Sequence, residues 1–312
     1  PGPGDDELRA VGWHPLRGWL VAGTRSLAQE KGDTTWSPTY DRGRAWFVRL
    51  KDDLTVVWHS YADYYGQETI RGGTVLREGD LWLAGDTRGY VNYGETPIDK
   101  PDGLALRVDG QTGNDSCPCG FFERTDATAT TPSRLESVLA DDKGQIFAAG
   151  WQTAANKLGD AWVQGMDSSG NVQFNQLFGK GGDDRVFAAV PDGAGFVLAG
   201  YTDSAGAGGK DGWLVRVSAS GKVLAEYTFG GGLDDELYKV RALPNGQWLA
   251  VGRSKSQAKG GYDGWAICLK PDFTFAWEKR IGLQVDDGLR GIAILGDGAS
   301  WRMLVAGYKG FN

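Results

Sequence analysis

The sequence predicts an all-β protein built from repeated four-stranded units, and three observations support this class. Residues 181–230 and 231–282 carry the same landmarks in the same order, from an acidic pair after glycine to an aromatic strand at the end. An apolar strand ending in a small residue and glycine occurs six times in the chain. The 49 glycines are too many for helices but suit tight turns between short strands. Similarity at a fixed period indicates a repeat architecture.

Each unit is expected to contain four strands in a fixed order. The first strand follows the acidic pair. The second, glycine-ending strand is expected at residues 19–23, 81–85, 146–150, 196–200, 248–252 and 303–307. The third is expected at residues 45–50, 103–108, 161–166, 212–217 and 264–269. The fourth is expected at residues 55–61, 120–125, 171–178, 222–229 and 273–280. The repeats span approximately residues 1–63, 64–125, 126–179, 180–230, 231–282 and 283–312, within one domain.

Short antiparallel strands that are apolar on both faces are typical of the blades of a β-propeller. Runs such as Trp-Leu-Val-Ala and Phe-Val-Leu-Ala fit strands sandwiched between neighbouring sheets. We therefore predict a propeller of six blades, the last incomplete because the sixth unit stops after its second strand. Five or seven blades are alternatives, and a parallel β-helix is the structural rival.

The repeat also resembles a known group of proteins. Its landmarks are Gly-Gly-x-Asp-Asp, Asp-Gly-x-x-Leu-Ala-Gly and Gly-x-Asp-Gly-Trp-Leu-Val-Arg-Val. This pattern is similar to the Gly/Asp-rich propeller repeats of bacterial secreted and surface proteins, with a weaker similarity to quinoprotein-like propellers. The resemblance implies a propeller fold and frequent export, and it implies no activity. An extracytoplasmic location, periplasmic or at the cell surface, is expected, with the cytoplasm as the alternative. The start at Pro1 predicts a processed or excised product.

Composition excludes two classes of partner. The net charge is -7, without a basic stripe, which argues against a nucleic-acid surface. No run of 18 apolar residues is present, so no membrane span is expected. The three cysteines predict no disulfide framework. Cys117 and Cys119 form a free pair, a strained disulfide or part of a metal site, and Cys268 is expected to be a small buried hydrophobe.

The first two units carry long insertions between their second and third strands, at residues 24–44 and 86–103. A third insertion lies at residues 124–133, and the topology of a blade would place all three on one face. Aromatic side chains with a polar group are favoured at contact surfaces. We therefore expect a ligand or partner site at Trp36, Tyr40, Tyr90 and Tyr93. The alternative is that these side chains fold back over the sheets as local plugs.

Acidic residues precede the first strand in four of the six units. The residues Asp6, Asp184, Asp235 and Asp287 are candidate ligands for Ca²⁺, which prefers several oxygen ligands. The alternative is structural: an Asp after glycine accepts backbone N–H groups in its own turn and holds neighbouring sheets together. The same structural interpretation applies to Asp102, Asp160, Asp211 and Asp263 at the start of the third strands.

No catalytic signature is present in the sequence. His14 and His59 are the only histidines, and there is no HExxH, CxxC or GxSxG motif. We therefore expect a non-enzymatic binding or scaffold protein within a larger assembly. Its partner would be another protein chain that completes the last blade, since an open blade exposes unpaired backbone groups. The alternative is a carbohydrate-binding or carbohydrate-active propeller that uses the loop aromatics.

Overall fold

The computed structural model describes residues 6–25, 44–62, 66–89, 102–114, 132–141, 143–153, 158–193, 195–296 and 300–310. The strands fall into antiparallel sheets, and the described part contains no α-helix. The all-β expectation is therefore confirmed. The chain divides into two compact units, one of residues 1–148 and 164–173, and the other of residues 149–163 and 174–312. We call these unit 1 and unit 2.

Unit 1 begins with two sheets. The first has the order β1-β2-β3-β4 and consists of β1 (Asp6–His14), β2 (Gly18–Arg25), β3 (Arg44–Leu50) and β4 (Val56–Tyr61). The second has the order β5-β6-β7 and consists of β5 (Gly66–Val75), β6 (Leu81–Gly89) and β7 (Asp102–Val108). Leu20, Phe47, Ile70 and Leu83 are fully buried in the core that these two sheets share. The fourth strand expected at residues 120–125 lies outside the described residues.

The next sheet contributes residues to both units. It has the order β11-β10-β9-β8 and consists of β8 (Ser133–Ala140), β9 (Ile146–Thr153), β10 (Gly159–Met166) and β11 (Val172–Phe178). Each sheet again follows sequence order from one edge to the other, as the repeat predicted.

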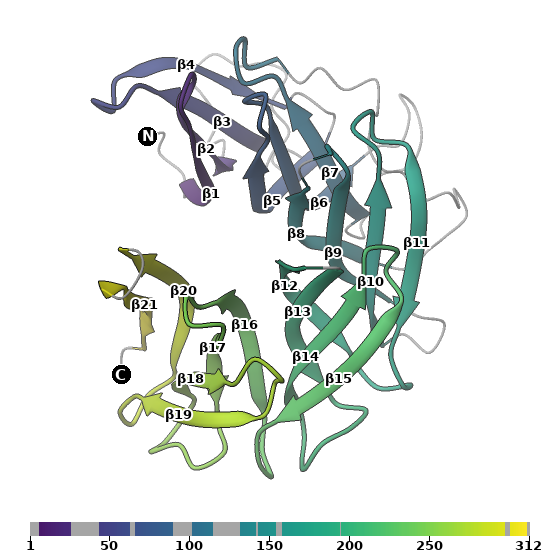
Figure 1. Cartoon of the computed structure of the whole chain (residues 1–312), viewed down its shortest axis with the longest axis vertical. Coiled ribbons are helices and arrows are strands. Elements are labelled where there is room, and N and C mark those ends of the chain that lie inside the picture. The colour runs from purple at the N-terminus through teal and green to yellow at the C-terminus, as the bar shows by residue number, and fades with distance from the viewer. Residues whose placement is uncertain are drawn as a thin grey trace. The chain divides into compact units, whose positions relative to one another are not determined.

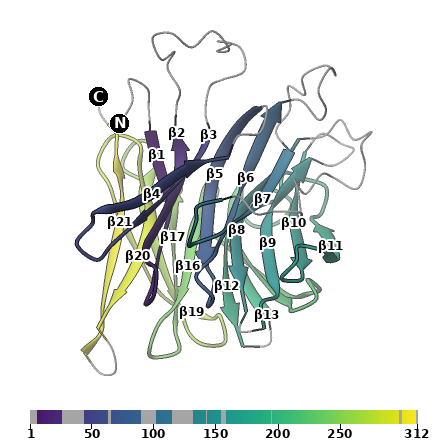
Figure 2. The ribbon, with the colours of Figure 1, turned by 90° about the horizontal axis from the view of Figure 1, so that it is seen from above.

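The remaining sheets belong to unit 2 (Figure 1). One four-stranded sheet consists of β12 (Arg185–Asp192), β13 (Gly195–Thr202), β14 (Asp211–Ser218) and β15 (Val223–Phe229). The next consists of β16 (Asp235–Ala242), β17 (Trp248–Ser254), β18 (Asp263–Leu269) and β19 (Phe275–Ile281). The last has only two strands, β20 (Asp287–Leu295) and β21 (Arg302–Lys309). Figure 2 shows β20 and β21 side by side.

In unit 2, the third strands β14 and β18 are buried on both faces. Every residue of β18 is buried, and β14 is buried at all but two positions. Trp265 is 1% exposed and packs in one core with Leu214 and Leu237. Cys268, on the opposite face of β18, is a buried free thiol, as expected. Among the described residues, no helix has the length and apolar character needed to cross a membrane.

A β-bulge explains the glycine that recurs in the second strands. Five first strands skip one residue in their pairing with the second strand, at Arg9, Arg71, Phe187, Tyr238 and Arg290. A Cβ on the recurring glycine would lie within 2.0 Å of a carbonyl oxygen of the bulged strand at Gly23, Gly85, Gly200, Gly252 and Gly307. The glycine is therefore required by this close approach, and the second strand continues past it instead of ending there.

Candidate functional site

The second residue of each acidic pair in unit 2 is buried and bound to its own turn. Asp184, Asp235 and Asp287 are 1%, 0% and 4% exposed. Each carboxylate accepts the amide N–H four residues earlier in the chain, at 2.9 Å from Lys180, 2.8 Å from Gly231 and 2.9 Å from Leu283. Each also accepts a group from a residue at or just after the end of the second strand, for example the Ser256 hydroxyl at 2.7 Å from Asp235.

The first residue of each pair binds the sheet that precedes it. The carboxylates of Asp183, Asp234 and Asp286 accept the amide N–H groups of Gly159 at 3.0 Å, Lys210 at 3.1 Å and Tyr262 at 2.8 Å. Each donor is the first residue of the third strand of the preceding sheet or the residue just before it. The structural interpretation of the acidic pairs is therefore confirmed at these positions. Similar bonds form at Asp211, which accepts the amide of Ala207 at 3.0 Å.

The calcium site stays a prediction. In the described part of the chain, no group of three or more His, Cys, Asp or Glu side chains could hold a metal ion. The side chain of Asp6 lies outside the described residues. Two neighbouring carboxylates do influence each other: burial, and next the charge of Asp184, raise the pKa of Asp160 above its ordinary value of 3.8.

A row of bulge residues and charged groups lines the beginning of the first strands in unit 2. The rings of Phe187 and Tyr238 lie 5.5 Å apart, and the Arg290 guanidinium lies 3.5 Å from the centroid of the Tyr238 ring. Arg290 also lies 5.7 Å from the Tyr308 ring. Sequence reasoning missed this row, although its members all stand three positions after the second acidic residue.

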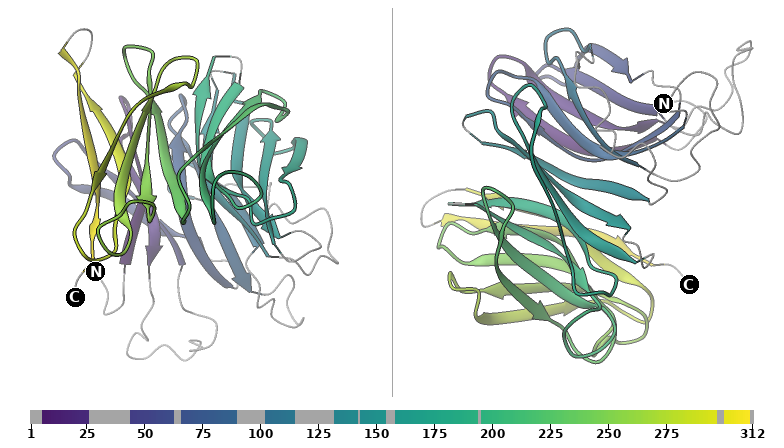
Figure 3. Two further views of the ribbon diagram at one scale, coloured as in Figure 1. Left: turned by 90° about the horizontal axis from the view of Figure 1, so that it is seen from below. Right: turned by 90° about the vertical axis from the view of Figure 1, so that its right-hand side faces the viewer.

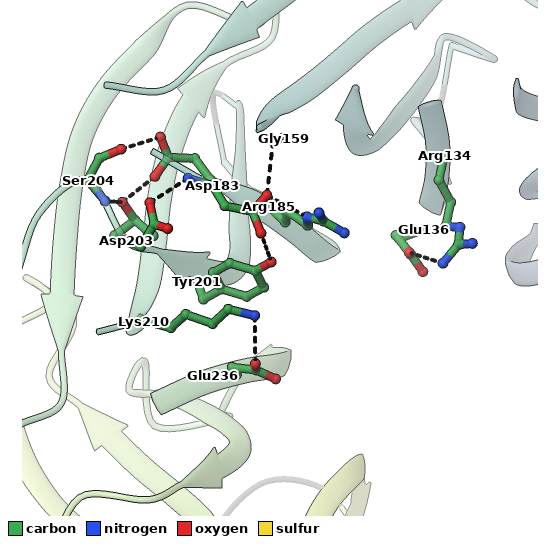
Figure 4. Close-up of polar contacts among 12 residues, drawn as sticks. Arg134, Glu136, Gly159, Asp183, Arg185, Tyr201, Asp203, Ser204, Lys210 and Glu236 are labelled. Atoms are coloured by element: carbon green, nitrogen blue, oxygen red, sulfur yellow. Dashed lines mark hydrogen bonds and ion pairs between the residues drawn. The ribbon is translucent and has the colours of Figure 1, made fainter. Parts of the chain in front are cut away.

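Glu236 is the charged centre of this row. It is 4% exposed, lies 3.3 Å from Lys210 Nζ and 3.0 Å from Arg253, and accepts the Tyr238 hydroxyl (Figure 4 shows the Lys210 contact). Burial raises the pKa of Glu236, but the bonds from Arg253 and Tyr238 together lower it by more than burial raises it. The pKa of Glu236 therefore lies below its ordinary value of 4.5. Burial and the charge of Glu236 hold the pKa of Tyr238 well above 10.0, so its hydroxyl remains a donor at neutral pH.

Two other tyrosines next to Glu236, Tyr201 and Tyr262, also donate their hydroxyls to carboxylates. The Tyr201 hydroxyl donates to Asp183 at 2.5 Å, and Lys210 Nζ lies 4.0 Å from the Tyr201 ring (Figure 4). Burial and the hydrogen bond to Asp234 raise the pKa of Tyr262 to about 12. Each acid and phenol in this network is satisfied by a neighbour, so the geometry indicates a structural clamp.

The two-stranded sheet leaves an edge of unit 2 open. No described strand pairs with the outer side of β21, whereas β13 and β17 each pair with a third strand there. In Figure 3, the strands β20 and β21 are the yellow ribbons. Met303, Leu304 and Tyr308 are 39%, 56% and 41% exposed. Apolar side chains and unpaired backbone groups therefore occur together on one strand.

The face of the preceding sheet is exposed next to this edge. The side chains of Trp277 and Ile281 in β19 are 38% and 48% exposed. Phe229 in β15 occupies the position that Ile281 occupies in β19. Phe229 is half-buried, because the next sheet covers it with Trp265 and its neighbours. We call β21 together with Trp277 and Ile281 the open-edge surface.

The predicted aromatic site lies outside the described residues. This holds for Trp36, Tyr40, Tyr90 and Tyr93, and also for Cys117 and Cys119. The carbohydrate alternative, which depends on those four aromatic residues, stays a prediction.

Comparisons with known proteins find similar structures but no matching family model or curated sequence. A Hadza microbial sialidase shares the fold with a TM-score of 0.51 at 11% identity, over 92% of this chain and 60% of the sialidase. A protein of unknown function from Bacteroides caccae gives a TM-score of 0.49 at 13% identity, over 90% of this chain and 84% of that protein. These likenesses concern β-rich folds and carry no activity to this chain.

Proposed function

We propose that this chain is a non-enzymatic scaffold that binds another polypeptide by strand addition at the outer edge of β21. In this proposal the six sheets are blades of a β-propeller, and the last described sheet presents the outer edge of its second strand, β21. The fold shared with a sialidase, itself a propeller, supports the architecture. The observation that carries the function is the two-stranded sheet β20–β21 beside four-stranded neighbours built from the same repeat.

The direction of the backbone groups in β21 supports strand addition. Gly310 donates its amide N–H to the carbonyl of Asp286 at 2.8 Å, toward β20. Because these groups alternate along a strand, the amides of Met303, Val305, Gly307 and Lys309 face away from β20. An exposed row of this kind is a template for another strand unless charge, proline or a covering loop blocks it. The charged residues of β21, Arg302 and Lys309, stand at its two ends, and the residues between them carry no charge and no proline.

The test combines photo-cross-linking with an edge-blocking variant. A photoreactive residue in place of Leu304 should capture a partner from the native source, and the partner is then purified and its Kd measured. Met303→Pro removes one outward N–H but no bond to β20, so we expect at least about tenfold weaker binding. Met303→Ala keeps the N–H and serves as the matched control.

One outcome would contradict the proposal, namely equal affinity of the purified partner for the Met303→Pro and Met303→Ala variants. Circular dichroism of both variants checks that the fold is retained.

A further inference from the structure

The bulge of the first strand holds an arginine in three of the described sheets, and two of these arginines pair with a carboxylate. Arg9 lies 2.6 Å from Glu7, and Arg71 lies 3.1 Å from Asp86. Glu7 stands two residues before its bulge, and Asp86 directly follows the recurring glycine of the second strand. Each arginine therefore finds its acid within its own sheet.

Arg290, the third of these arginines, has neither kind of partner. Gly288 stands two residues before its bulge, and Tyr308 directly follows the recurring glycine. A Cβ on Gly288 would lie 2.7 Å from an atom of the Tyr308 ring, so this ring fills the space of a side chain there. In the described part of the chain, the exposed Arg290 contacts aromatic rings and has no carboxylate at ion-pair distance.

Two aromatic rings fix the position of the Arg290 guanidinium. It lies 3.5 Å from the centroid of the Tyr238 ring and 5.7 Å from that of Tyr308. Tyr238 is 5% exposed and its hydroxyl donates to Glu236, so its ring is a rigid platform. A guanidinium that stacks on a ring uses its flat face, and the N–H groups at its edge stay available for hydrogen bonds.

The nearest buried acid already serves other cations. Glu236 lies 3.0 Å from Arg253 and 3.3 Å from Lys210. Arg253 also lies over the Tyr238 ring, at 5.9 Å from its centroid, so Arg290 adds a further positive charge beside the same tyrosine. No acid among the described residues balances that charge at ion-pair distance, although the whole chain has a net charge of -7.

The hydroxyl of Tyr308 lacks an acid as well. Three other tyrosines of this row donate their hydroxyls to carboxylates, in the pairs Tyr201–Asp183, Tyr238–Glu236 and Tyr262–Asp234. The Tyr308 hydroxyl has no such acceptor within the described ranges. Its oxygen lies 2.9 Å from the Cβ position of Gly288, which corresponds to Glu7 in the first sheet. A guanidinium and a neighbouring phenol thus both lack the carboxylate that their counterparts bind.

We propose that Arg290 and Tyr308 form a binding site for a carboxylate-bearing ligand. The ligand's two oxygens accept N–H groups from the edge of the Arg290 guanidinium, and one of them also accepts the Tyr308 hydroxyl. The ligand thereby takes the place that Glu7 and Asp86 fill in the other sheets. The site uses side chains and not the outer backbone edge of β21, so it does not depend on strand addition.

The first test is a titration of the whole chain with sodium acetate at neutral pH, followed by the NMR signal of Arg290 Nε–Hε. We expect a saturable shift with a Kd on the order of 10 mM, because one guanidinium and one hydroxyl bind a small anion in contact with water. Sodium chloride at the same ionic strength is the control and should give no saturable shift.

Variants of the two residues test their roles. Arg290→Lys keeps the charge but loses the planar pair of donors, so acetate should bind at least about fivefold more weakly, as followed by the Tyr308 ring signals. Tyr308→Phe keeps the ring and should weaken binding about two- to fivefold. Arg241→Gln, at an exposed arginine near the other end of β16, is the matched control and should leave binding unchanged.

A charge placed within the sheet tests the comparison with the other arginines. In the Tyr308→Asp variant the new acid stands where Asp86 stands beside Arg71, so it should pair with Arg290 and abolish the saturable acetate shift. Tyr308→Asn has nearly the same shape without the charge and should still bind acetate, as weakly as Tyr308→Phe does. Equal acetate binding by the Asp and Asn variants would overturn the site.

The remaining arms identify the source of the carboxylate. N-acetylglutamate amide imitates an acidic side chain of a peptide: tighter binding than acetate assigns the ligand to a peptide, and equal binding assigns it to a small molecule. Tighter binding of inorganic phosphate than of acetate would overturn the carboxylate assignment. Absence of a saturable shift in the wild type would overturn the proposal, whether the site has no affinity or another acid of this chain already fills it.

Discussion

At the scale of single residues, the buried aspartates are the most strongly constrained side chains of the repeat. Asp235 is fully buried and accepts the Gly231 amide at 2.8 Å and the Ser256 hydroxyl at 2.7 Å. Asp235→Ala removes the acceptor of the Gly231 amide and leaves the Ser256 hydroxyl only the Leu233 carbonyl at 3.4 Å, so we expect a loss of about 2 to 4 kcal/mol in the free energy of unfolding. Urea unfolding measures it. Asp272→Ala, in an exposed turn that also caps an amide at 3.0 Å, is the control and should cost much less. Equal losses would show that burial of the Asp235 bonds is unimportant.

Glu236 gives a prediction about pH. Because its folded pKa lies below the ordinary 4.5, its contribution to stability is complete above that value and is lost as the pH falls below it. Glu236→Gln should therefore cost about 2 to 3 kcal/mol at neutral pH, and the difference from the wild type should shrink between about pH 5 and about pH 3. Thermal unfolding over this pH range measures the difference.

The control for this prediction is a more exposed ion pair. Glu226 lies 3.2 Å from Lys180, and both side chains are accessible to solvent. Glu226→Gln should change stability little at any pH. A pH-independent difference between the wild type and Glu236→Gln would mean that shape, and not the charge of Glu236, is what the site requires.

The residue scale also shows where the sequence was sufficient. The structural role of Asp184 and Asp235 could be predicted because it depends on a local turn with glycine before the acid. The contacts of Tyr238 and Arg290 were not predicted, because a bulge directs these side chains, and the bulge is marked only by their shared position three residues after the second acid and by the glycine on the opposite strand.

At the scale of elements, the glycine opposite each bulge controls whether the first two strands can pair. A Cβ at Gly252 would lie 1.8 Å from the Glu236 carbonyl oxygen and 2.8 Å from the Leu237 Cα, which are backbone atoms that cannot move aside. We expect Gly252→Ala to cost about 3 kcal/mol or more in unfolding free energy. Gly232→Ala is the control, since no atom lies within 4 Å of its Cβ position. An equally small loss at both positions, measured by urea unfolding, would remove the steric explanation.

The strands themselves were largely predictable, and their ends were not. Continuous apolar runs located β13, β14, β17 and β18, because a strand buried on both faces must be apolar throughout. The prediction that each second strand ends at the recurring glycine was wrong, since β13 continues two residues past Gly200, to Thr202. Its continuation carries polar residues that bind the acidic pair of the same sheet, and a hydrophobic pattern does not register such residues.

At the scale of the whole molecule, the repeat predicts how each sheet is built but not what completes the last one. In repeat architectures each sheet is stabilised mainly by its neighbours. Sheet β16–β19 has a neighbour on both sides, through the core with Trp265 on one face and the core with Cys268 on the other. Sheet β20–β21 is covered in unit 2 by β16–β19 alone, among the residues described. Stability should therefore decrease toward β21.

Hydrogen exchange followed by NMR should resolve this decrease strand by strand. Amides of β18, which is buried throughout, should exchange only through large-scale opening, because their partners lie on both sides. In β21 the outward amides of Met303, Val305 and Gly307 should exchange fastest, and the amide of Ala306, which faces β20, more slowly. Adding a bound strand should protect the outward set and leave the inward set nearly unchanged. Uniform slow exchange along β21 in the isolated protein would mean that its outer edge is already paired in solution, and strand addition by a partner would then have no free edge to use.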